Sequence, residues 1–390
     1  MPNIETIIDY IKQFLCYGDE KAAARIGYTA DESLWPTFAV VIVPNGHLGK
    51  DLVYPSMKSL KPHLCESTAK REHKTSIIEE DIIYNTFFFI SRAEELLNPK
   101  RDEHGRFLAA HSILGKHNNL QIPLVDEYSR LVCKLIDLPL PKKGYNHIYL
   151  THDIDVLTQY RHLRGALGGL YRGEYKKVLA AWHDINNDPV YTFPWLINED
   201  KTVKDAEQIY FVKQTNGKGY DYPQYCLNGK DWKHTEQLLL NAGAHLGLHS
   251  GYHGALPQSP YTLHRSHYLK CSIDKMAQLE KAGITDDFTM GFADKAGFRL
   301  QTTRAVRWIN PITMQLTNIT LHPLTVMDCT LSNTNYMHLD EEEAFYYCQQ
   351  LFDRVRMHHG ELVLLWHNSI LTNDNYHRRL YPKILSIIND

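Results

Sequence analysis

Two carboxylates stand directly after an apolar, β-forming run in the middle of the chain. Asp153 and Asp155 follow the segment 147–152 and are separated only by Ile154. In an extended segment, residues two apart point the same way, so the two acids can converge on one spot. Two close carboxylates repel each other, and a bound cation or a shared proton usually resolves the conflict. The alternative is that one of the acids caps a following helix.

A histidine pair follows a second strand-like segment, 244–248. His249 and His253 are four residues apart, a spacing that places two imidazoles on one face of a helical turn. Together with a carboxylate, the pair makes an Asp-His-His set, which leaves coordination positions open for water and substrate, as a catalytic metal requires. Because the chain has 22 histidines, such a pair can also be incidental.

Two further polar clusters follow strand-like segments. Arg299 lies after the segment 288–292 and could orient a catalytic carboxylate or bind substrate, whereas a surface ion pair is the alternative. His367 ends the apolar run 362–366 and is followed by polar residues, a position that points at the mouth of a barrel. A single histidine there is otherwise often a core residue with its hydrogen bonds satisfied.

Strand-like and helical segments alternate through the part of the chain that carries these residues. The predicted strands are 147–153, 208–213, 244–249, 288–292, 318–322 and 362–367. The predicted helices are 168–183, 234–242, 265–282 and 341–358. This alternation predicts a mainly parallel sheet, and over roughly 245 residues a (β/α) barrel is its natural closure. The carboxyl ends of the strands would then form the active-site face.

The first part of the chain has its own helical and strand-like segments. They are a helix at 3–15, a strand at 37–43, an apolar run at 82–90 that leads into a helix at 91–97, and an amphipathic helix at 124–137. A Pro/Lys/Gly stretch at 138–144 is typical of a linker. We therefore expect a smaller N-terminal α/β accessory domain at 1–143, without catalytic residues, and a barrel at 144–390.

Composition excludes several other classes of protein. Hydrophobic residues make up 43% of the chain and charged residues 22%, which is ordinary for a globular protein. The formal net charge of −3 offers no basic patch for nucleic acid. No run of about 18 apolar residues predicts a membrane span. The seven cysteines are scattered without a Cys-x-x-Cys pair, which favours a reduced, cytoplasmic protein.

Four motifs, in this order, resemble those of the polysaccharide deacetylase superfamily (NodB homology, carbohydrate esterase family 4). They are Thr-His-Asp-Ile-Asp at 151–155, His-Ser-x-x-His at 249–253, Gly-Phe-Arg at 297–299 and Leu-Trp-His-Asn at 365–368. The resemblance covers about residues 145–390. It implies a distorted (β/α)7 TIM-like barrel with one divalent metal, usually zinc, and removal of N-acetyl or O-acetyl groups from a carbohydrate or glycoconjugate. The N-terminal part looks like a bacterial domain often found before such deacetylases.

The resemblance also implies roles for the first two motifs. By position, Asp155, His249 and His253 would hold the metal, and Asp153 would be the general base. The usual first motif is Thr-Phe-Asp-Asp-Gly with adjacent acids, whereas Ile154 separates them here, as in the Asp-x-Asp subgroup.

The remaining motifs imply further catalytic and substrate contacts. Arg299 would keep the general base ionised, and His367 would protonate the leaving amine. Trp366 and Tyr252 are candidate substrate contacts, and Asp328 could contact substrate hydroxyls or tune His367. The third motif lacks the proline and aromatic residue that usually follow its arginine, so the substrate groove there should differ.

Two other functions remain open at this point. The Asp-x-Asp subgroup includes enzymes that hydrolyse a small non-sugar amide or cyclic ureide with the same site. A carbohydrate-binding protein that has lost turnover is the other alternative, although all four motifs retain residues that could react.

Overall fold

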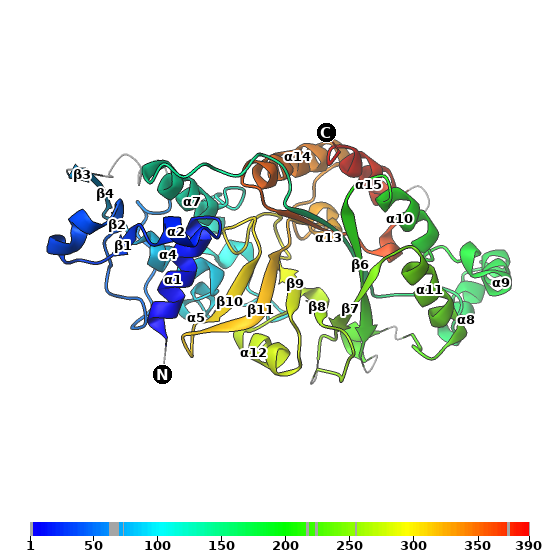
Figure 1. The fold of residues 1–390 in the computed structure, drawn as a ribbon. Helices are drawn as coiled ribbons and strands as arrows, with labels where there is room; N and C mark the ends of the chain where they lie inside the picture. Colours follow the sequence, from blue (N-terminus) through cyan, green and yellow to red (C-terminus); the bar gives the residue numbers. More distant parts are fainter. Residues whose placement is uncertain are drawn as a thin grey trace.

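A curled sheet of nine strands forms the C-terminal part of the molecule in this computed structural model, which describes residues 3–61, 70–72, 74–215, 218–222, 225–253, 256–372 and 375–389 (Figure 1). Its strand order is β10-β11-β9-β8-β7-β6-β5-β13-β12, and every pairing except β10 with β11 is parallel. The strands are β5 (His147–Ile154), β6 (Ala206–Gln214), β7 (His245–Ser250), β8 (Leu263–Ser266), β9 (Asp286–Met290), β10 (Val306–Asn310), β11 (Gln315–Pro323), β12 (Val326–Met327) and β13 (Glu361–Leu365).

The two margins of this sheet are joined by one bent segment. Only Leu324 and Thr325 separate β11, which pairs with β9, from β12, which pairs with β13. The amide of Leu324 donates to Met290 O at 3.1 Å, and the amide of Thr325 donates to Val363 O at 3.0 Å. The segment 315–327 therefore bridges both sides of the opening and makes the α/β fold barrel-like.

Side chains of β5 alternate between the inside and the outside of this curved sheet. Tyr149 belongs to an apolar cluster with residues of β6, β9 and β13, which only the interior can bring together. The even-numbered His152 points to the other side, where its Nε2 lies 2.9 Å from Asp200 Oδ2 of helix α10 (Phe193–Asp200). Asp153 therefore shares the inner face with Tyr149, because strand side chains alternate with a period of two.

Helices cover the outside of the curled sheet (Figure 1). Besides α10 they are α11 (Lys230–Asn241), α12 (Ile273–Lys281), α14 (Glu341–Met357) and α15 (Tyr376–Ser386). Helices α8 (Leu163–Tyr171) and α9 (Tyr175–His183) form a hairpin beyond α11, and the short α13 (Asp328–Ser332) directly follows β12 (Figure 1). None of the helices in the described ranges combines the length and the apolar character needed to cross a membrane.

The N-terminal part has a smaller sheet of its own, with the order β1-β2-β4-β3 and only β3 antiparallel. Its strands are β1 (Ile26–Tyr28), β2 (Val40–Ile42), β3 (Lys70–Glu72) and β4 (Thr75–Ile78). Its helices are α1 (Ile4–Leu15), α2 (Glu20–Ala23), α4 (Ile82–Ile90), α5 (Glu94–Leu97), α6 (Ile113–Lys116) and α7 (Leu124–Leu135).

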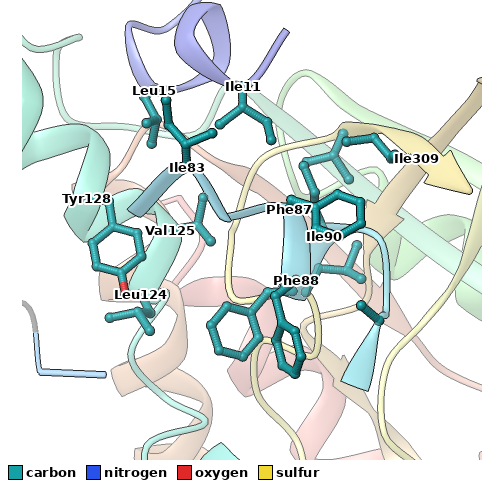
Figure 2. Close-up of a cluster of buried hydrophobic side chains, with 14 of the residues drawn as sticks. Ile11, Leu15, Ile83, Phe87, Phe88, Ile90, Leu124, Val125, Tyr128 and Ile309 are labelled. Carbon is teal, nitrogen blue, oxygen red and sulfur yellow. The ribbon is translucent and has the colours of Figure 1, made fainter. Parts of the chain in front are cut away.

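One continuous hydrophobic core joins the N-terminal part to the curled sheet. Every residue of α4 is buried, and its aromatic side chains pack between α1, α7 and β10 (Figure 2). Phe87 of α4 lies beside Ile309 of β10 in this cluster (Figure 2). A buried ion-pair chain crosses the same contact, because Glu95 binds both Arg92 and Arg299, each at 2.7 Å.

A second charged cluster lies at the opposite end of the strands from the predicted site. His322 of β11 contacts Glu361 Oε2 at 2.7 Å and Asp286 Oδ1 at 3.1 Å, and its ring stacks on Phe288. Burial alone would lower the pKa of His322, but the hydrogen bonds and charges of the two carboxylates raise it to about 9. Glu361 and Asp286 are the first residues of β13 and β9, so the cluster ties the beginnings of these two strands to His322 near the end of β11.

All six predicted strands of the C-terminal part are present, with ends shifted by a few residues. The prediction of a helix over 265–282 is wrong at its beginning: 263–266 form β8, and α12 begins only at Ile273. The predicted helix 168–183 is two helices, because the chain turns at Gly173 with a φ of 77°. The α/β class and a barrel-like sheet are confirmed, whereas the seven-stranded form and the domain boundary at 143 stay predictions.

Candidate metal centre

The two acids of the first motif lie at the carboxyl end of β5, as the sequence predicts. Asp155 Oδ1 is 3.3 Å from His249 Nε2, and Asp155 Oδ2 is 3.6 Å from His367 Nε2. Asp153 Oδ2 is 3.7 Å from His249 Nδ1 and 4.0 Å from His367 Nε2. Both carboxylates therefore converge on one spot between β7 and β13.

A third histidine completes the group around Asp155. His267, which directly follows β8, places Nε2 3.1 Å from Asp155 Oδ1. One ligand atom from each of Asp155, His249 and His267 lies within 4.8 Å of the others. One carboxylate and two imidazoles from three separate strand ends are the donor set of a catalytic zinc site with three protein ligands.

The Nδ1 atoms of His249 and His267, which point away from Asp155, each have a hydrogen-bond partner. His249 Nδ1 lies 3.1 Å from the carbonyl oxygen of Arg265, which can only accept, so the proton is on Nδ1 and the lone pair on Nε2. His267 Nδ1 lies 2.9 Å from Asp221 Oδ1, a carboxylate that fixes the same tautomer. Both Nε2 atoms are thus presented to Asp155.

The inner atoms of this group lack the partners that buried polar atoms normally have. Among the described residues, His249 Nε2 and Asp155 Oδ1 are buried without a hydrogen-bond partner. Burial would raise the pKa of Asp155, but its electrostatic interaction with the adjacent His267 and His249 holds that pKa well below its ordinary value. An ionised carboxylate facing two imidazole lone pairs fits a divalent cation.

His253, predicted as the second imidazole ligand, does not join this group. Strand β7 ends at Ser250, and residues 252–253 form a bend rather than a helical turn, so the spacing of four does not bring the two rings together. The side chain of His253 is exposed and contacts the ring of Tyr252. The imidazole at the expected place belongs to His267, inside the segment predicted as helix.

Arg299, predicted to hold the general base, also lies elsewhere. Its guanidinium binds Glu95 at 2.7 Å and the carbonyl of Gly291 at 2.8 Å, within the contact to the N-terminal part. The fully buried Arg265 of β8 takes the expected place, with Nη1 3.1 Å from Asp153 Oδ1 and 2.7 Å from Thr151 Oγ1. No motif marks Arg265, and a single buried arginine in a short polar segment gives no periodic signal.

His367 and Asp328 form a pair on the opposite side of Asp155. His367 Nδ1 lies 2.9 Å from Asp328 Oδ1, and its backbone amide donates to the other carboxylate oxygen. Burial would lower the pKa of His367, but the charge and hydrogen bond of Asp328 raise it well above its ordinary value. Asp328 therefore lies where it can tune His367, one of its two predicted roles, and it favours the protonated form of that imidazole.

Trp366, predicted to contact substrate, points away from the site. It is fully buried and packs against Tyr381 and His377 of α15, because neighbouring strand residues face opposite sides. Tyr252 is nine-tenths buried behind the rings of Tyr220 and Tyr268. It supports the wall of the cavity rather than lining it.

A cavity of about 370 Å³ opens above the two acids and His367. Tyrosines at 220, 222, 268 and 336 line it, together with Lys213 of β6, whose pKa burial lowers against the opposing charges of Asp155 and Asp221. Arg106, from the N-terminal part, also lines it, and its Nη2 donates to Tyr336 Oη at 2.8 Å. The N-terminal part therefore supplies a charged side chain to the cavity that carries the candidate metal centre.

Comparison with known proteins adds little to this geometry. Residues 3–141 match the model of a family of unknown function (DUF7033). No curated protein sequence matches the chain. Among solved structures, the chain is similar to one described as "Crystal structure of putative polysaccharide deacetylase from Mycobacterium smegmatis", at 12% identity and a TM-score of 0.40. The match covers 64% of this chain and 88% of that one.

Proposed function

We propose that the protein is a metal-dependent hydrolase that removes acetyl groups from an N- or O-acetylated carbohydrate or glycoconjugate. The observation that carries this proposal is the group Asp155, His249 and His267 at three strand ends. It lies between a buried Asp153–Arg265 pair and a His367–Asp328 pair, and Asp153, Asp155, His267 and His367 line one cavity. These are a ligand set, a base and an acid, which hydrolysis of an unreactive amide requires together.

Asp155, His249 and His267 would hold one divalent metal ion, and we infer zinc from the two nitrogens and one oxygen that they offer. When bound, the metal would polarise the acetyl carbonyl and lower the pKa of a water molecule. Two of these ligands are those predicted from the sequence, and the third is His267 in place of His253.

The acid and base work falls to two further residues. Asp153 accepts the proton of the attacking water, and Arg265 fixes the orientation of Asp153 through a hydrogen bond. As the water oxygen adds to the acetyl carbon and the C–N bond breaks, His367 donates its proton to the departing nitrogen. The products are acetate and a free amine. For an O-acetyl substrate, the same proton would go to the departing oxygen.

The cavity suits a sugar. Tyrosine offers both an apolar face and a hydroxyl, and four tyrosines line the space beside the two acids. Arg106 and the tyrosine it contacts place the N-terminal part, which we continue to treat as an accessory domain ending near 143, beside the substrate. If the bent segment 315–327 is counted as one strand and the antiparallel β10 is left out, the sheet has seven parallel strands, which supports the (β/α)7 form. We also propose a cytoplasmic location, because the six described cysteines are all free.

The experiment is a hydrolysis screen on metal-loaded protein. Zinc-, cobalt- and nickel-loaded enzyme is incubated with a panel of N- and O-acetylated sugars and with small amides and cyclic ureides, and released acetate and ammonia are measured separately. We expect acetate from at least one acetylated sugar and its loss in Asp153→Asn. Ammonia without acetate would instead assign the site to a small amide or ureide. Ring opening of a cyclic ureide releases neither product, so consumption of the ureides is measured as well, and absence of acetate, ammonia and ureide consumption with a fully metal-loaded protein would refute hydrolysis.

A further inference from the structure

The hairpin of α8 and α9 exposes an unusual concentration of large apolar side chains at one end of the molecule (Figure 1). Of the 17 large hydrophobic side chains exposed in the described residues, seven lie between 163 and 182. They include Tyr171 at 94%, Leu163 at 75% and Leu179 at 66% exposure. Single exposed apolar residues are normal on a soluble surface, but seven within 20 residues mark a contact surface.

These side chains form a stripe along each helix. On α8 they are Leu163, Leu167, Leu170 and Tyr171, and on α9 they are Tyr175, Leu179 and Trp182. Both sets begin with residues spaced i, i+4 and i+7, which lie on one face of a helix. We call the seven residues the hairpin stripe.

The hairpin packs through small residues instead. Ala166 and Gly169 of α8 and Val178 and Ala181 of α9 are the buried positions. Gly169 allows the close approach, since a Cβ there would lie 2.6 Å from Val178 Cγ2. The contact between the helices is thus made by small residues. Among the described contacts, Trp182 alone of the hairpin stripe also serves it, by donating its indole N–H to the carbonyl oxygen of Tyr160 at 2.8 Å.

The hairpin is also strongly basic in a chain with a net charge of −3. Residues 161–183 contain five arginines and lysines against a single acid, Glu174, and one of the five, Arg161, is paired with Asp231 of α11 at 2.7 Å. That acid is shared by Arg172 at 2.9 Å and Lys177 at 3.8 Å. Among the described residues, Arg164 and Lys176 are exposed without a carboxylate partner, and each is the neighbour of a stripe residue in sequence. Apolar and aromatic side chains beside unpaired positive charges complement an anionic membrane surface.

We propose that the hairpin docks on an anionic membrane surface, with the hairpin stripe in the interface. Helices of nine residues are about 13 Å long and cannot span a hydrocarbon layer of about 30 Å, but they can lie in the plane of the interface. Tryptophan and tyrosine are the residues enriched at that depth. A second copy of the chain is a poorer occupant, because the same basic surface would face itself.

The hairpin is connected to the candidate metal centre. The guanidinium of Arg164 lies 4.8 Å from the ring centroid of Tyr222, which lines the cavity. A docked hairpin therefore brings the cavity close to the lipid surface, where a membrane-held substrate would reach it. The docking itself does not depend on the proposed hydrolase activity.

The test is co-sedimentation of the full chain with vesicles of phosphatidylcholine alone and of phosphatidylcholine with 30% phosphatidylglycerol (about the anionic fraction of a charged membrane surface). We expect binding to the anionic vesicles only, weakened by salt. The triple variant Leu167→Ser, Tyr171→Ser, Leu179→Ser should lose at least about a hundredfold in binding, because each large apolar side chain contributes a factor of roughly ten. Lys176→Gln with Lys177→Gln should cost roughly fivefold for each charge removed.

The matched control is Leu240→Ser, Ile312→Ser, Tyr346→Ser, which removes two aliphatic side chains and one tyrosine that are at least half exposed elsewhere on the surface. It should bind vesicles like the wild type. Absence of wild-type binding to anionic vesicles, or equal losses in the hairpin and control variants, would overturn the proposal. So would a wild-type dimer in sedimentation that the hairpin variant converts to a monomer, since the stripe would then be covered by a second copy. None of these measurements depends on enzyme activity.

Discussion

The replacement of His253 by His267 among the metal ligands can be tested with two variants that make the same chemical change. His267→Ala removes one of three protein ligands, whereas His253→Ala removes an exposed imidazole of the neighbouring loop. Substitution of residues that only support a ligand typically costs about 10- to 100-fold in metal affinity. Loss of the ligand itself should exceed that range, so we expect at least about a 100-fold loss for His267→Ala, or about 2.7 kcal/mol.

An intermediate variant makes this prediction quantitative. Asp221→Asn keeps His267 but replaces the carboxylate that lies 2.9 Å from its Nδ1. It should weaken zinc binding by about 10- to 100-fold, between the other two variants. The assay is titration of zinc-free protein with zinc in a competing chelator, followed by measurement of bound metal per chain. Thermal unfolding of each zinc-free variant checks that it is folded. Loss of zinc in His253→Ala with unchanged binding in His267→Ala would refute the assignment.

Three further predictions concern charges around the site and the barrel. Asp153→Asn should keep its metal and lose about 10²- to 10⁴-fold in turnover, whereas Asp155→Asn should lose metal affinity. If Asp153→Asn loses the metal and Asp155→Asn keeps it, Asp153 is the ligand and Asp155 the base. Arg265→Met should reduce kcat without removing the metal, because Asp153 loses the hydrogen bond that fixes its orientation; a fully active variant would exclude Arg265 from orienting the base. The pKa of His322 is raised from 6.5 to about 9, so its contribution to stability is complete below pH 6.5 and is lost as pH rises through 9. At 1.36 kcal/mol per pKa unit, this contribution to the free energy of unfolding is up to about 3 kcal/mol. In urea unfolding, the free energy of unfolding of His322→Asn should therefore change less with pH than that of the wild type. An equal pH dependence in the two proteins would contradict this prediction.

The sequence predicts those site residues that end a clearly apolar strand. Asp153, Asp155 and His367 follow strands whose apolar character alone locates the carboxyl edge of the sheet. The residues that were missed, Arg265 and His267, both come from β8 and the turn after it. Strand β8 contains Leu263 and three polar residues. The three polar residues are buried and make hydrogen bonds that no local sequence pattern reveals. Residues 265 and 266 of this strand therefore fall inside the helix that the sequence predicts over 265–282.

The error over His253 has a different physical origin. A spacing of four brings two side chains together only if the backbone between them is helical. Here the chain leaves β7 after Ser250 in a bend, so His249 points into the barrel while His253 points into solvent. Similarly, Arg299 matched a motif in sequence, but Glu95, more than 200 residues earlier, binds it in space. Such long-range partners decide the role of a charged residue and cannot be read locally.

The shared core has a consequence for how the protein is made on the ribosome. The N-terminal part leaves the exit tunnel first, with the fully buried, aromatic-rich α4 near its middle. The residues that finish covering that helix, among them Trp308 and Ile309 of β10, are synthesised more than 200 positions later. At about 5–20 residues per second, a nascent chain would display this surface for some 10 seconds or more. Newly made chains should thus be clients of holding chaperones until β10 arrives, and a synthesis-stalled fragment ending before residue 306 should aggregate when released.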